Sequence, residues 1–121
     1  MREPQKRKPV RFVGSSQSDL HRFPKKVRLI IGTALTAAQL GGKHKDSKPM
    51  KGFGGAGVVE IVDDFDGAFR AVYTVRFADV VYVLHAFQKK SKKGIETPKS
   101  DIDLINHRLK VAEQDYKSGR K

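Results

Sequence analysis

The chain has 121 residues, 38% of them hydrophobic and 31% charged, which is enough for a single domain with its own core. Lys and Arg outnumber Asp and Glu by 25 to 13, giving a net charge of +12. That charge favours a polyanion such as nucleic acid as partner, ahead of an acidic protein or an anionic membrane. The absence of cysteine excludes disulfides and thiolate metal sites. No apolar run approaches the ~18 residues of a membrane span, and no hydrophobic segment follows the basic N-terminus, so we expect a cytoplasmic protein without membrane contact.

The first third of the chain predicts an arm, a strand and two helices. Residues 1–9 are charged and aperiodic, which predicts a flexible basic arm before a single domain at 10–121. A short strand is expected at 10–16, a helical turn at 18–23 and a longer helix at 24–40, ended by a glycine pair. The apolar residues of the longer helix recur at helical spacing: Val27, Ile30, Ile31, Ala34, Leu35 and Ala38.

The rest of the chain predicts a loop, three strands and a final helix. Six glycines and a proline mark 41–57 as a long loop. Strands rich in Val, Phe and Tyr are expected at 58–63, 69–77 and 80–87, joined by hairpin turns, and a helix begins at Thr97. The order β-α-α-β-β-β-α indicates an α+β fold, which we expect to be a small antiparallel sheet with the helices packed on one face.

Strand pairing sorts the polar residues of this sheet by face. A two-residue turn at Ala78-Asp79 would place Arg70 opposite Phe87 and Val72 opposite His85. Arg70 and His85 would then share a solvent-exposed face, because the large apolar residues of the strand alternate onto the other one. Lys89, the start of a lysine run, would follow on the same side if the strand ran on. A slip of one residue would move His85 into the core.

The same counting raises a difficulty at the preceding hairpin. A two-residue turn at Asp66-Gly67 would put Glu60 beside Tyr73, on the core side. Either that turn is longer than two residues, or Glu60 is a buried carboxylate with a partner elsewhere.

Each of these residues also has a purely structural interpretation. A single histidine in an apolar strand such as His85 is most often packed and hydrogen-bonded. Arg70 could neutralise Asp63 or Asp64 across the hairpin. The lysines at 89–93 could form a solvated loop.

Two further motifs are excluded. The segment "GFGGAG" is not a phosphate-binding loop, because no strand precedes it and no Gly-Lys-Ser/Thr ends it. The four histidines show no metal-ligand spacing, so no metal site and no cofactor is predicted.

Several segments resemble, in order, the phage-derived HigB-like toxins of the RelE/ParE superfamily. They are "RFVGSSQSDLHRFPKKV", "KPMKGFGGAGVVEI", "FRAVYTVRF", "VYVLHAFQKKSKKGIETP" and "DIDLINHRLKVAEQDY". The resemblance covers nearly all of the chain after residue 9, and the stretch "LHAFQKKSKK…TP" is its most specific part.

The resemblance implies the toxin of a type II toxin–antitoxin pair. In the RelE and HigB branches the toxin cuts mRNA in the ribosomal A site, whereas in the ParE branch the same fold inhibits DNA gyrase. The implied partners are the ribosome, mRNA and a cognate antitoxin, a helix-turn-helix protein from the adjacent gene. A ParE-like gyrase inhibitor and a non-catalytic basic RNA-binding module stay open as alternatives, because a binder needs only the charge.

The resemblance also points to site residues. The strand arginine of RelE-type enzymes, in a "YR-x-x-Y" setting, matches Arg70 in "FRAVY", and the basic residues after their last strand match the lysine run. RelE toxins have a functional tyrosine near the C-terminus; Tyr116 matches it only loosely in position, and the role is not transferred. The candidate catalytic residues are Arg70, His85, Lys89 and Lys90. The candidate RNA-binding residues are Lys51, Arg76, Lys92, Lys93 and Lys99.

These residue types suit RNA cleavage without a metal. Attack of a 2′-hydroxyl on the adjacent phosphate needs a base, charge stabilisation and a proton for the leaving 5′-oxygen. A guanidinium such as Arg70 forks onto phosphate oxygens. His85 could act as base or acid, and a lysine surrounded by like charges loses its proton more readily.

Overall fold

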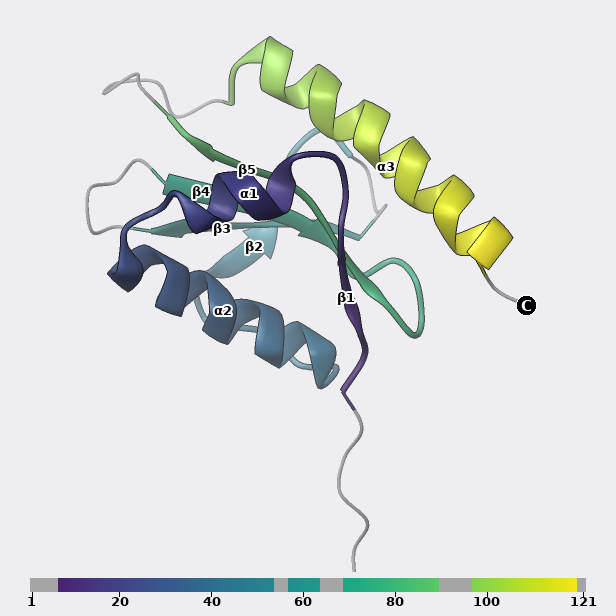
Figure 1. The fold of residues 1–121 in the computed structure, drawn as a ribbon, viewed down its shortest axis with the longest axis horizontal. Coiled ribbons are helices and arrows are strands. Elements are labelled where there is room, and N and C mark those ends of the chain that lie inside the picture. The colour runs from purple at the N-terminus through teal and green to yellow at the C-terminus, as the bar shows by residue number, and fades with distance from the viewer. Residues whose placement is uncertain (1–6, 54–56, 64–68, 90–96, 120–121) are drawn as a thin grey trace, which may run out of the picture.

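The computed structural model describes residues 7–53, 57–63, 69–89 and 97–119, and its elements follow the predicted order (Figure 1). In chain order they are β1 (Val10–Phe12), α1 (Ser16–His21), α2 (Lys25–Gln39), β2 (Ser47–Pro49), β3 (Val58–Asp63), β4 (Phe69–Thr74), β5 (Val81–Gln88) and α3 (Lys99–Gly119). The α+β class is confirmed. The predicted order gains one short strand, β2, inside the segment that we expected to be a loop.

The strands form one five-stranded sheet in the order β1-β5-β4-β3-β2. The pairs β2–β3, β3–β4 and β4–β5 are antiparallel, but β1 runs parallel to β5. The prediction of an antiparallel sheet is therefore wrong for β1. The sequence pattern did not show β2 because it has three residues and ends in Pro49. Proline is tolerated there because β2 is an edge strand.

The helices cover both faces of the sheet, and the expectation that they pack on one face is wrong (Figure 1). One core cluster joins α1 and α2 to one face: Leu20, Phe23, Val27, Ile31, Ala34, Leu35, Ala38, Ile61, Phe69, Ala71, Tyr73, Val81, Val83 and Ala86. A second cluster joins α3 to the other face: Val13, Met50, Val58, Val72, Phe77, Val80, Tyr82, Leu84, Ile105, Leu109 and Ala112. The long amphipathic helix α3 needs an apolar surface of its own, and the second sheet face provides it.

This arrangement buries the central strand β4 completely. All six of its residues are buried, including Val72 and Thr74 at 0% exposure. We expected one face of this strand to be exposed to solvent, and that is wrong because α3 lies over it. Arg70, on the same face, is only 8% exposed.

Local sequence signals determine where α2 begins and ends. Helix α2 begins directly after Pro24 and ends where Gly41 takes a φ of +84°, a conformation that glycine adopts without strain. Lys8 and Pro9, which we assigned to the arm, hydrogen-bond through their backbones to Gln39 and Val81.

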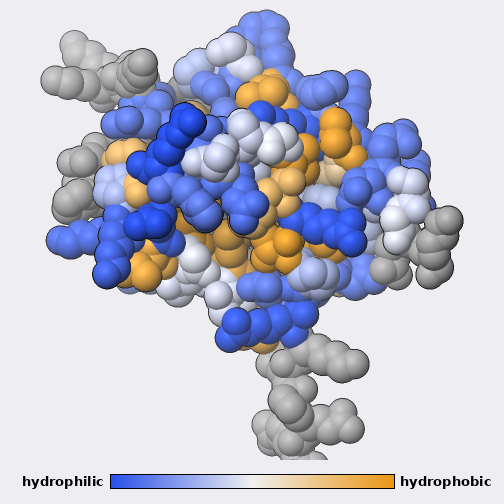
Figure 2. All heavy atoms as spheres, viewed as in Figure 1, coloured by the Kyte–Doolittle hydropathy of each residue, from blue (hydrophilic) through white to orange (hydrophobic). Residues whose placement is uncertain are grey.

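The face drawn in Figure 2 is largely hydrophilic, with apolar groups gathered toward its middle. No helix in the described part of the chain is long and apolar enough to cross a membrane.

Candidate functional site

Two cross-strand rows on the α3 side of the sheet carry the candidate site. In one row Arg70 lies opposite Phe87, and in the next Val72 lies opposite His85. Both pairs agree with the register predicted from sequence. Glu60 of β3 lies opposite Val72 and therefore belongs to the same row as His85. Glu60, Arg70 and His85 thus come from three adjacent strands and share one face.

Arg70 is paired with Glu60 inside the protein. Its Nη1 lies 3.2 Å from Glu60 Oε1, and the two side chains are only 10% and 9% exposed. Lys48 approaches the same oxygen at 4.0 Å from an exposed position on β2. Arg70 Nε is buried and has no hydrogen-bond partner in the described structure.

The observed register of β3 and β4 answers the question that the sequence raised about Glu60. Val59, not Glu60, lies opposite Tyr73, so the turn is longer than two residues. Glu60 is also a buried carboxylate, with Arg70 as its partner. Asp63 lies opposite Phe69, which puts it on the other face from Arg70, and Asp64 is outside the described residues.

A bulge in β5 determines where His85 points. The register shifts between Val72, which lies opposite His85, and Tyr73, which lies opposite Val83. Leu84 is left as the extra residue, and it packs in the α3 cluster whereas Val83 packs in the α2 cluster. His85 therefore stays on the Arg70 face, as predicted, although the turn between the strands is longer than the two residues we assumed.

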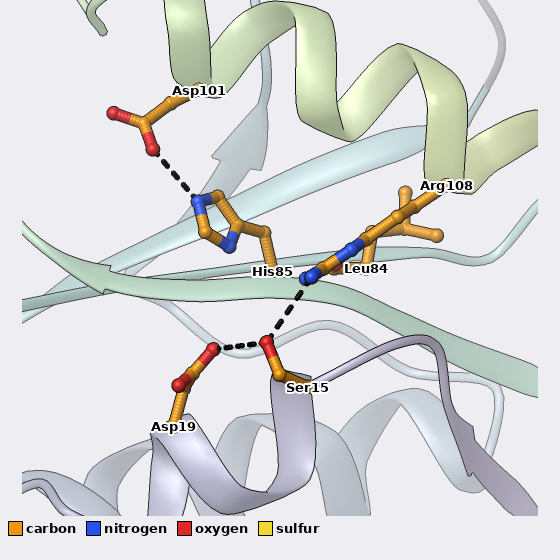
Figure 3. Close-up of polar contacts among 6 residues, drawn as sticks. All are labelled: Ser15, Asp19, Leu84, His85, Asp101 and Arg108. Carbon is orange, nitrogen blue, oxygen red and sulfur yellow. Dashed lines mark hydrogen bonds and ion pairs between the residues drawn. The ribbon is translucent and has the colours of Figure 1, made fainter.

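His85 contacts α3 through one ring nitrogen (Figure 3). Its Nε2 lies 2.8 Å from Asp101 Oδ1, and its ring stacks on Phe87 with centroids 4.6 Å apart and planes 19° apart. His85 is 7% exposed, so the expectation of a solvent-facing histidine is wrong. The other nitrogen, Nδ1, is buried and has no hydrogen-bond partner in the described structure.

The lysine run is only partly described. Lys89 follows β5 directly and is 6% exposed, so this lysine does not belong to a solvated loop. Lys90, Lys92 and Lys93 lie outside the described residues.

The other predicted RNA-binding residues do not join this face. Arg76 lies beyond the end of β4 and pairs with Glu113 of α3 at 3.2 Å. Lys51 is exposed in the turn after β2. Lys99 begins α3, is 87% exposed and pairs with Asp103 at 3.0 Å.

A second polar network connects α1 and α3 to the backbone of β5 (Figure 3). Arg108 donates from Nη1 to the Leu84 carbonyl at 3.0 Å and from Nη2 to Ser15 Oγ at 3.1 Å, and Ser15 Oγ donates to Asp19 at 2.8 Å. Gly14 has a φ of +58°, and a Cβ there would lie 2.8 Å from the Arg108 guanidinium. Sequence reasoning missed this network, as it missed Asp101, because neither lies in a recognisable motif.

The far end of α3 is fixed by two tyrosines. Tyr82 donates to Asp115 at 2.6 Å, and Tyr116 donates to Asp79 at 2.9 Å. Burial and the neighbouring Asp115 carboxylate raise the pKa of Tyr82 to about 12. The Tyr82 hydrogen bond in turn lowers the pKa of Asp115, with help from Arg11. The Tyr116 hydroxyl is thus engaged at this end of α3, away from the rows of Arg70 and His85.

Two buried nitrogens on this face, Arg70 Nε and His85 Nδ1, can bind a ligand that offers both a hydrogen-bond acceptor and a donor. Arg70 Nε–H is a donor, and the unprotonated nitrogen of a neutral imidazole is an acceptor. Buried polar atoms are nearly always hydrogen-bonded, so two unsatisfied atoms in adjacent rows need an explanation, and a bound ligand is one. Within the described residues, no group of three or more His, Asp or Glu side chains is placed to hold a metal ion.

Comparison with solved structures shows a RelE-like fold. The isolated Escherichia coli RelE toxin matches with a TM-score of 0.56 at 15% identity, covering 71% of this chain and 88% of that one. A mutant of the same toxin in the free state matches with a TM-score of 0.57 at 14% identity, covering 86% of this chain and 96% of that one. The toxin–antitoxin complex RelBE2 from Mycobacterium tuberculosis matches more weakly, with a TM-score of 0.46 at 19% identity, covering 74% of this chain and 100% of that one.

The sequence match is to a family rather than to a single relative. The family described as "Phage derived protein Gp49-like (DUF891)" matches residues 18–110. Comparison with curated proteins finds no match. The chain belongs to the phage-derived Gp49-like family and has the fold of the RelE toxins.

Proposed function

We propose that this protein is the toxin of a type II toxin–antitoxin system and cleaves mRNA on the ribosome. The family match, the fold shared with RelE and the net charge of +12 support a toxin that acts on RNA. One observation carries the catalytic part of the proposal. Arg70 and His85 occupy adjacent rows of one sheet face, and each has a buried nitrogen without a hydrogen-bond partner in the described structure.

In the proposed reaction the 2′-hydroxyl attacks the adjacent phosphate. His85 accepts the hydroxyl proton, the bond from O2′ to phosphorus forms, and the bond from phosphorus to O5′ breaks. Arg70 binds the phosphate oxygens and stabilises the charge that develops on them. The leaving 5′-oxygen takes a proton from the Lys89 ammonium. The products are a 2′,3′-cyclic phosphate and a free 5′-hydroxyl.

The free protein holds this site closed. The Glu60 carboxylate binds Nη1 of the Arg70 guanidinium, and both Arg70 and His85 are less than one-tenth exposed. An RNA phosphate must therefore compete with Glu60 and reach a covered face. A site of this kind gains from a substrate that is already oriented, and the ribosome supplies such orientation. In this proposal Lys90, Lys92 and Lys93, with the exposed Lys51 and Lys99, contact RNA phosphates, and a cognate antitoxin encoded nearby restrains the toxin.

The test is single-turnover cleavage of mRNA on programmed ribosomes. Arg70→Lys and His85→Gln should each slow cleavage by roughly 10²-fold or more, because they remove a charge-stabilising fork and a general base. Arg22→Gln is the control, since its side chain is 81% exposed and lies after α1, away from this face.

Two results would contradict the proposal. Equal cleavage by all four proteins would remove Arg70 and His85 from the chemistry. Inhibition of DNA gyrase by the wild-type chain without any mRNA cleavage would replace the nuclease with a gyrase inhibitor.

A further inference from the structure

We infer that Asp101 is a positioning residue for His85: its carboxylate fixes the tautomer and orientation of the imidazole, so that Nδ1 is the atom that takes the ribose proton. This inference rests on the proposed function and deepens it, because it assigns a part in the reaction to the first turn of α3.

The hydrogen bond determines which nitrogen carries the proton. A carboxylate only accepts hydrogen bonds, so His85 Nε2, 2.8 Å from Asp101 Oδ1, must be the donor. In the neutral ring the lone pair is then on Nδ1, which is the nitrogen left without a partner. The base in the proposed reaction is therefore Nδ1.

The ring is held on two sides. Asp101 approaches its edge from α3, and Phe87 stacks against its face from two positions along the same strand. The side chains of His85 and Asp101 are 8% and 24% exposed, so water competes weakly for this contact. An imidazole held in this way does not need to reorient before it accepts a proton.

The charge of Asp101 also matters once the proton has moved. When Nδ1 takes the 2′-hydroxyl proton, the ring becomes an imidazolium, and the carboxylate at Nε2 stabilises that cation. Asparagine would keep the size of the side chain but remove the charge. Its amide can either accept from or donate to Nε2, so it would no longer select one tautomer.

The chain provides a matched control for this residue. Asp103 lies two residues further along α3, its side chain is 62% exposed, and it pairs with Lys99 instead. Asp101→Asn and Asp103→Asn therefore remove the same charge from the same helix end, and only the first touches His85.

The test combines kinetics with a spectroscopic signature. In single-turnover cleavage on programmed ribosomes, Asp101→Asn should lose roughly 10²–10⁴-fold in rate, the range that general acid–base catalysis supplies, while Asp103→Asn stays at the wild-type rate. Asp101→Glu keeps a carboxylate and should recover part of the loss. In ¹⁵N NMR of the ring nitrogens, with His85→Gln used for assignment, the wild type should show the Nε2–H tautomer and Asp101→Asn a mixture.

The outcomes separate this inference from the proposed function. Normal wild-type cleavage with equal rates for Asp101→Asn and Asp103→Asn would overturn the assignment of Asp101 alone. An Nδ1–H tautomer in the wild type would overturn it as well. A wild-type chain that cleaves no message would overturn the proposed function, and the catalytic part of this inference would fall with it.

Discussion

The Arg70 guanidinium and the Glu60 carboxylate lie 3.2 Å apart on the sheet face that packs against α3, and the two side chains are 10% and 9% exposed. A buried pair of this kind contributes little net stability when intact, because both charges lose their hydration. Removing one partner is costly, because the other charge then stays buried without compensation. The residue proposed to stabilise the reacting phosphate is therefore also part of the folded core.

This relationship predicts a large stability effect at Arg70. Arg70→Met should lower the free energy of unfolding by about 3–5 kcal/mol, because it leaves the buried Glu60 with Lys48, 4.0 Å away and exposed, as its remaining ion-pair partner among the described residues. The double variant Arg70→Met/Glu60→Gln should lose less than the sum of the two single variants. Urea unfolding of the four proteins measures both quantities.

The control for this cycle is an exposed ion pair. Arg11 and Asp115 lie 2.9 Å apart with side chains 54% and 46% exposed, so removing their attraction should cost no more than about 1 kcal/mol. If Arg70→Met costs no more than Arg11→Met, the pair with Glu60 is not buried in solution.

A second prediction concerns the glycine beneath Arg108. Gly14→Ala should destabilise the protein by about 1 kcal/mol or more, because Gly14 has a φ of +58° and a Cβ would lie 2.8 Å from the guanidinium. Gly32→Ala, in the exposed middle of α2 with no atom within 4 Å of the new Cβ, should instead stabilise by about 0.5–1 kcal/mol. Thermal unfolding of both variants checks the opposite signs, and a shared sign would contradict the geometry at Gly14.

A third prediction concerns acid. The hydrogen bond from Tyr82 lowers the pKa of Asp115 below its ordinary value of 3.8, so the unfolded chain binds a proton to this carboxylate more readily than the folded chain. The associated stabilisation is present above pH 3.8 and is lost as the pH falls through the lower, folded-state pKa.

Tyr82→Phe tests that contribution. The variant should lose less stability than the wild type between about pH 4 and pH 2, because its Asp115 has a pKa closer to the ordinary value. Parallel curves of unfolding free energy against pH for the two proteins would show that the hydrogen bond does not control this carboxylate.

A fourth prediction concerns salt. Three lysines proposed to contact RNA phosphates are changed together to glutamine: Lys90, Lys92 and Lys93. Each lost phosphate contact on a single strand removes about 0.7 from the slope of log affinity against log salt, so the triple variant should flatten the slope for ribosome binding by about 2.

The control carries the same change of charge on α2, which packs on the sheet face away from Arg70 and His85. It replaces three basic residues near the start of α2 with glutamine: Lys25, Lys26 and Arg28. Its slope should stay close to that of the wild type. Equal flattening by both triple variants would show that binding senses only net charge and that the lysine run is no specific contact.

The sequence by itself determined the elements and much of the pairing. Apolar periodicity placed α2 and α3, because helices of this length bury a continuous stripe that repeats every three or four residues. Alternation and turn residues placed β3, β4 and β5, and counting from the turn put Arg70 opposite Phe87. These features are local, so neighbouring residues encode them.

Only the tertiary structure decided the surroundings of the site. The alternation of Arg70 with apolar residues predicted that β4 has one buried and one solvent-exposed face. No residue near β4 in the sequence shows that α3 packs on the second face. Glu60 became the partner of Arg70 because the preceding hairpin loop is longer than two residues, and the bulge at Leu84 kept His85 on the same face. Asp101 meets His85 only through the docking of α3, a contact that depends on packing between segments distant in sequence.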